Sequence, residues 1–258
     1  MATSRLRTDQ QAGDGRASVS FRRWTGAFGL AVVALSWAQF PLYLISGTPP
    51  AYDAAALAES FHASSSVVFT RILLDLGLYV ALMVFAARFA QLVMKARARL
   101  EWLGLLIFGS AAVWIGVTLV ANGLEGGAAL DTLGGNADAS AVRALVDGYL
   151  LTYNGSIAFA ITALFVGAAG YATFVTGVLP RWTGWLAYVA TALCVISVPV
   201  IFAGPLDYGG FWNPGGWGPA IIANFPPLIW FLVVGAVMSA KPKAAPSYTP
   251  AKRVGAGQ

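Results

Sequence analysis

Two ionisable residues of opposite charge lie one helical turn apart at the head of an apolar segment. Arg71 and Asp75 belong to the sequence TRILLD, which begins a long run of apolar residues. Ionisable groups are costly inside a lipid bilayer, and those that occur there commonly serve a function. At a spacing of four residues both side chains lie on the same face of a helix. The pair predicts mutual neutralisation that fixes the depth of the helix, a polar binding or proton-handling site, or a contact with a partner.

Further polar residues are expected near this pair, because they lie near the same ends of the other apolar segments. The candidates for ligand binding are Arg71, Asp75, Asn122, Asn154, Trp212 and Asn224. The candidates for a catalytic acid are Asp75, Glu125 and Asp147. Asparagine also links membrane helices by hydrogen bonds, and tryptophan is common at membrane interfaces. Trp212 is included because its loop, residues 204–218, is rich in glycine and aromatic residues and could cover a ligand.

The chain contains one cysteine, Cys194, and one histidine, His62. A disulfide within the chain is therefore excluded, and so is a metal site built from several cysteines and histidines. We expect no metal and no cofactor. We interpret His62 as an exposed loop residue.

The composition is that of a membrane protein. Of 258 residues, 58% are hydrophobic and only 10% are charged, whereas soluble domains contain roughly 25% charged residues. Six apolar runs approach the length of about 20 residues that a bilayer requires. They cover residues 24–45, 67–94, 101–123, 148–178, 182–203 and 219–240. The sequence therefore predicts an all-α fold, a bundle of six transmembrane helices.

The distribution of charge predicts the orientation of these helices. Lysine and arginine gather in the two tails, in the turn at residues 95–99 and at Arg181, all on one side of the six spans. The loops on the other side, residues 46–66, 124–147 and 204–218, are mainly acidic. Because basic loops stay in the cytoplasm, both termini are expected there. The net charge of +5 then reflects topology, and nucleic acid is not an expected partner.

Three regions follow from this pattern. Residues 1–23 and 241–258 are predicted to be disordered cytoplasmic tails, and residues 24–240 form the transmembrane domain. The lipid bilayer is the expected surrounding. An apolar small molecule, a membrane protein or a second copy of the chain are the candidate partners.

Two short motifs suggest a family. Arg71-Ile-Leu-Leu-Asp75 heads one span, and Leu179-Pro-Arg-Trp-Thr-Gly-Trp185 opens another. Together they resemble a bacterial family, common in actinobacteria, of small multi-span membrane proteins with a domain of unknown function. The likeness covers residues 24–240. It implies a six-helix bundle in the bacterial cell membrane and no particular activity.

Three functions remain open from the sequence. The first is a non-catalytic membrane protein that binds a lipid, a small apolar ligand or a partner subunit at an outward-facing vestibule. The second is a membrane enzyme in which a carboxylic acid protonates an apolar substrate, as in terpene cyclases. The third is a secondary transporter. The first is preferred because no recognised catalytic motif is present and polar residues gather on one side of the membrane.

Overall fold

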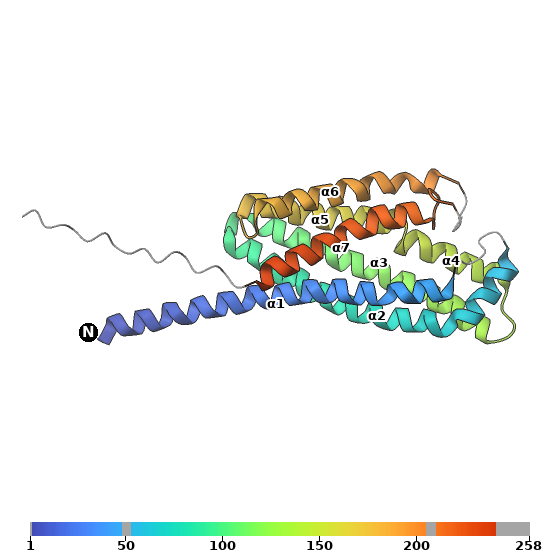
Figure 1. Cartoon of the computed structure of the whole chain (residues 1–258), viewed down its shortest axis with the longest axis horizontal. Coiled ribbons are helices and arrows are strands. Elements are labelled where there is room, and N and C mark those ends of the chain that lie inside the picture. Colours follow the sequence, from blue (N-terminus) through green and yellow to red (C-terminus); the bar gives the residue numbers. More distant parts are fainter. Residues whose placement is uncertain (1, 48–52, 205–209, 241–258) are drawn as a thin grey trace, which may run out of the picture.

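The computed structural model describes residues 2–47, 53–204 and 210–240, and all regular structure in these ranges is helical. Figure 1 shows a bundle of long helices that run side by side. The elements are α1 (Ala2–Ser46), α2 (Ala54–Ala96), η1 (Ala98–Leu100), α3 (Glu101–Leu133), α4 (Ala139–Tyr153), α5 (Ser156–Thr176), α6 (Arg181–Ser197), η2 (Val198–Phe202) and α7 (Trp217–Ser239). The predicted all-α fold is confirmed.

Six stretches within the described ranges are long and apolar enough to cross a bilayer. They are Val19–Ser46, Ala54–Ala96, Ala98–Leu133, Ala139–Thr176, Arg181–Phe202 and Trp217–Ser239. The fourth stretch combines α4 and α5, and the fifth combines α6 with η2. Six spans are therefore confirmed, and the protein is a multi-pass integral membrane protein.

The connections between helices divide between the two ends of the bundle (Figure 1). One end, here called the basic end, contains the connections α2–α3 and α5–α6 with Lys95, Arg97, Arg99 and Arg181. The opposite, acidic end contains the connections α1–α2, α3–α4 and α6–α7. Its acids include Asp53, Glu59, Asp131 and Asp138. The charge asymmetry expected from the sequence is thus an asymmetry of the folded bundle.

The predicted loop at residues 124–147 is wrong, because α3 continues to Leu133 and α4 begins at Ala139. The chain here is rich in alanine, and Ala128 and Ala129 are fully buried. They pack in one apolar cluster with Val142 and Val146 of α4. Burial of this alanine-rich face stabilises the helical conformation of residues for which the abundance of glycine and charge predicts a loop.

The predicted loop at residues 46–66 is also too long. Asp53 is the N-cap of α2, and its side chain accepts hydrogen bonds from the backbone N–H groups of Ala55 and Ala56 at 2.9 and 3.2 Å. Such a cap satisfies donors that a helix start leaves free. His62 therefore lies on α2 rather than in a loop. Its side chain is exposed, and its Nδ1 lies 3.0 Å from the carbonyl oxygen of Thr132.

The two predicted tails differ in what the structure describes. α1 begins at Ala2, so helical backbone covers residues 2–23, and this extension projects beyond the bundle (Figure 1). A helix without packing partners depends on local propensity alone, so the disorder of this tail in solution stays a prediction. Residues 241–258 lie outside the described ranges.

α1 and α7 approach closely through glycine. A Cβ added to Gly235 would lie 2.9 Å from Cγ of Leu30 and 3.0 Å from the carbonyl oxygen of Gly26. Small residues allow such close packing between membrane helices. This contact sets the distance between the two helices whose outer parts contain Gln39 and Asn224.

Pro227 removes a backbone donor from the middle of α7, which frees the carbonyl group of Ala223 one turn earlier. That carbonyl oxygen accepts a hydrogen bond from Sγ of Cys194 on α6 at 3.2 Å. In a bilayer a freed carbonyl needs a partner within the protein. Cys194 thus supplies a hydrogen bond to the carbonyl group that Pro227 leaves free, and it links α6 to α7.

Aromatic side chains fill the centre of the bundle towards the basic end. Phe85 and Phe89 of α2 stack with ring centroids 5.7 Å apart. Phe165 of α5 stacks on Phe231 of α7 at 5.8 Å, and Trp230 lies 5.1 Å from Phe231. All five side chains are fully buried. They form a cluster, here called the aromatic layer, on the basic-end side of the polar residues of the acidic half.

The orientation can be tested by cysteine labelling in a Cys194→Ala background. Asn136 is exposed in the α3–α4 connection at the acidic end, and Ala98 is exposed in η1 at the basic end. We expect Asn136→Cys to react with a membrane-impermeant maleimide in intact cells, and Ala98→Cys only after permeabilisation. The reverse pattern would contradict cytoplasmic termini.

Candidate functional site

A cavity of about 300 Å³ lies in the acidic half of the bundle. Its walls come from α1, α2, α3, α4, α5 and α7, and it extends from Gly47 and Gly216 near the acidic end to Phe231 of the aromatic layer. Most of the lining is apolar or aromatic, with Trp37, Phe40 and Phe225 on one wall. A volume of roughly 300–1,000 Å³ is typical of small-molecule sites.

Arg71 lines this cavity and forms an ion pair with Glu125, not with Asp75. The guanidinium donates from Nη2 to Oε1 of Glu125, which lies on α3. Both residues are buried, with exposed fractions of 6% and 3%. The predicted neutralisation of Arg71 by Asp75 is therefore wrong. Asp75 lies one turn away on the same helix, but the ion pair of Arg71 is formed by Glu125 on the facing helix α3.

Asp75 accepts hydrogen bonds from neutral groups on three other helices. Gln39 Nε2 donates to Oδ1 at 2.6 Å, and Asn122 Nδ2 donates to Oδ2 at 3.0 Å. The hydroxyl of Tyr153 lies 2.9 and 3.0 Å from the two carboxylate oxygens. An ionised carboxylate only accepts hydrogen bonds, so this arrangement suits the charged form of Asp75.

Tyrosines surround the charged groups. The guanidinium carbon of Arg71 lies 4.3 Å from the ring centroid of Tyr43, which is cation–π geometry. Tyr149 and Tyr153 stack at 5.3 Å, and the hydroxyl of Tyr79 accepts a hydrogen bond from Asn122 at 3.0 Å. All four tyrosines also line the cavity.

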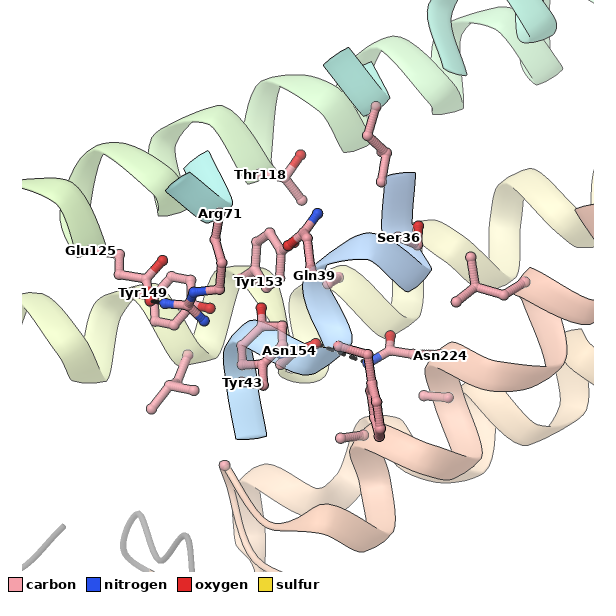
Figure 2. Close-up of a pocket in the computed structure, with 18 of the residues that line it drawn as sticks. Ser36, Gln39, Tyr43, Arg71, Thr118, Glu125, Tyr149, Tyr153, Asn154 and Asn224 are labelled. Atoms are coloured by element: carbon pink, nitrogen blue, oxygen red, sulfur yellow. Dashed lines mark hydrogen bonds and ion pairs between the residues drawn. The ribbon is translucent and has the colours of Figure 1, made fainter. Parts of the chain in front are cut away.

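The opposite side of the cavity contains a pair of amides. Asn224 Nδ2 donates to Oδ1 of Asn154 at 2.8 Å, and both side chains line the cavity. In Figure 2 this pair lies across the view from Arg71, Glu125 and Tyr149.

Asn154 ends α4, and the following Gly155 has an extended backbone. A Cβ at Gly155 would lie 2.8 Å from the Cα of Leu151, so the break between α4 and α5 requires glycine. The break brings Asn154 to the cavity.

The structure separates the predicted site residues into two groups. Arg71, Asp75, Asn122, Glu125, Asn154 and Asn224 lie in or directly behind the cavity wall. Asp147 is half-exposed on α4, where its Oδ2 lies 3.9 Å from Nε of Arg143. Trp212 is partly exposed and is not part of the lining, to which its loop contributes Gly215, Gly216 and Trp217 instead. Residues 205–209 of this loop lie outside the described ranges.

Sequence reasoning missed Gln39, Tyr43, Tyr79 and Tyr149. Gln39 is the clearest omission, since a buried amide in an apolar span needs a polar partner on a neighbouring helix. The tyrosines are a weaker signal for a polar site, because tyrosine is also common at membrane interfaces. Glu125 was placed at a loop edge, and the extension of α3 to Leu133 explains why it is buried instead.

The arrangement combines an ion pair, a hydrogen-bonded carboxyl group and an amide pair around one cavity. Amide and hydroxyl groups contact Asp75, and the guanidinium of Arg71 contacts Glu125. Nε of Arg71 and Oδ1 of Asn122 are buried and lack a hydrogen-bond partner in the part of the chain that the structure describes. In those same residues no three His, Cys, Asp or Glu side chains gather as metal ligands would.

Comparisons with protein-family models, with curated proteins and with solved structures find no match to this chain. The interpretation of the site therefore depends on its geometry and chemistry. The family resemblance carried by residues 71–75 and 179–185 stays a prediction.

The partner of Arg71 can be tested by comparing double variants. Breaking a buried ion pair costs about 3–5 kcal/mol, whereas removing both charges is often close to neutral. We expect Arg71→Gln and Glu125→Gln each to lower the melting temperature in mild detergent, and the double variant to recover most of the loss. The matched control is Arg71→Gln with Asp75→Asn, which should recover less. Equal recovery in the two double variants would contradict the Arg71–Glu125 pair.

Proposed function

We propose that this protein binds a small amphipathic molecule in the cavity of its acidic half, and that this half faces the outside of a bacterial plasma membrane. The observation that carries the proposal is a cavity of about 300 Å³ whose lining is largely apolar but includes Arg71, Glu125 and an amide pair. Ligand sites combine an apolar lining with a few placed polar groups in this way. The basic end then faces the cytoplasm.

A small molecule suits the cavity better than a partner subunit does. Residues from six helices line it, so a ligand would be held between helices of one chain. A subunit interface would use an outer face of the helices. A lipid chain or an apolar metabolite can enter a space of this kind, and its polar end would meet the side chains of Arg71 and Asn224.

Binding is also favoured over the two alternative functions. Catalysis by an acid needs a carboxyl group that can transfer a proton to a substrate, whereas Glu125 is paired with Arg71 and Asp75 lies behind the cavity wall. Transport needs a route past the cavity. The fully buried side chains of Phe85, Phe165 and Trp230 pack together between the cavity and the basic end.

The proposal can be tested by filling the cavity. Ala220 of α7 lines the cavity, whereas Ala236 of the same helix is exposed and outside it. We expect native mass spectrometry of the wild-type protein, purified in mild detergent, to detect a bound small molecule that survives in Ala236→Phe and is lost in Ala220→Phe. The same bound species in all three proteins would contradict binding in this cavity, as would its absence from the wild type.

A further inference from the structure

Only one of the two buried carboxyl groups at the cavity has an ion-pair partner among the described residues. The cavity lining contains Arg71 and Glu125, which form an ion pair. Asp75 lies directly behind the wall, because Gln39 and Tyr153 both line the cavity and both contact its carboxyl group. Two carboxyl groups thus lie near one guanidinium, and Asp75 is the one without a cationic partner in the described ranges.

The carboxyl group of Asp75 is hydrogen-bonded but has no ion-pair partner in the described part of the chain. The side chains of Gln39, Asn122 and Tyr153, which contact it, are neutral, and its exposed fraction is only 3%. When ionised, Asp75 is a buried charge without an opposite charge, which is unfavourable even where its hydrogen bonds are satisfied. A cation in the neighbouring cavity would stabilise this ionised form.

The aromatic lining of the cavity suits an organic cation. Aromatic faces attract ammonium groups, and Trp37, Phe40, Tyr43 and Phe225 all line this space. The guanidinium of Arg71 over Tyr43 shows that a cation and an aromatic ring already pair here. Tyr153 donates its hydroxyl to a carboxylate, which increases the electron density of its ring and so its attraction for a cation.

We infer that the ligand is a monovalent organic cation, an ammonium group on an apolar body. This inference rests on the proposed binding function and names the ligand class for the same cavity. An anionic ligand would meet Arg71 already paired with Glu125 and would lie near the carboxyl group of Asp75. An inorganic cation would balance the charge but would leave the apolar walls unfilled.

The test uses three probes that share a hexanoyl ester and differ in charge. Hexanoylcholine is the cation, 3,3-dimethylbutyl hexanoate is its neutral isostere, and 2-sulfoethyl hexanoate is the anion. Binding to the protein in lipid nanodiscs is measured by isothermal titration calorimetry, with empty nanodiscs subtracted. We expect the cation to bind at least about tenfold more tightly than the neutral isostere, and the anion not to bind measurably.

Two variants that remove one negative charge locate the effect. Asp75→Asn should weaken cation binding about tenfold and abolish the preference over the neutral isostere. Asp147→Asn is the matched control, because Asp147 is half-exposed beside Arg143 and outside the cavity. It should leave the preference unchanged. If Asp75→Asn does not fold, the comparison of the three probes on the wild-type protein still decides the charge of the ligand.

The outcomes separate this inference from the proposed function. Equal or tighter binding of the neutral or anionic probe would overturn the inference and support the cavity as a binding site. Loss of cation preference in Asp147→Asn rather than Asp75→Asn would overturn the assignment to this cavity. No binding of any probe, together with no co-purified molecule, would overturn both.

Discussion

The carboxylate of Asp75 is the group on which the acidic half of the bundle depends. A charge in this position cannot be hydrated by lipid, so the protein itself must supply its hydrogen bonds. They come from Gln39 on α1, Asn122 on α3 and Tyr153 at the end of α4. One side chain of α2 therefore fixes the rotation and depth of three neighbouring helices. The Arg71–Glu125 pair adds a second tie between α2 and α3.

The two halves of the bundle are stabilised by different forces. Towards the basic end, the aromatic layer packs as a soluble core would, and its stability comes from close contact between rings. In the acidic half, polar groups replace part of this packing and leave a cavity. Polar networks of this kind specify one arrangement because an altered arrangement leaves buried groups without partners. The acidic half thus gains a defined geometry at the cost of packing density.

Much of the fold could be predicted from the sequence, because the length and spacing of apolar runs are imposed by the bilayer. The distribution of lysine and arginine likewise distinguished the two ends. The extent of α3 and α4 could not be predicted, since the helix beyond Leu124 depends on burial of Ala128 and Ala129 against another helix. The local composition of residues 124–147 does not indicate this contact between helices.

The candidate site was predicted in part and for a similar reason. Polar residues inside spans are rare, so Arg71, Asp75 and Asn122 stood out. The partners of these residues could not be predicted, because spacing along one helix identifies only the neighbours on that helix. Glu125 and Gln39 reach the charged groups through the packing of separate helices, which depends on the whole bundle. Asp147 has the same residue type as Asp75 but lies on the outer face of α4.

The sequence distances between these partners have a consequence for how the protein is made. Glu125 follows Arg71 by 54 residues, and Tyr153 follows Asp75 by 78. A chain synthesised from its N-terminus delivers α2 to the membrane before either partner has left the ribosome. During that interval Arg71 and Asp75, one turn apart, are the opposite charges nearest to each other. The spacing of Arg71 and Asp75 would therefore allow a temporary ion pair until α3 and α4 insert and supply the final partners.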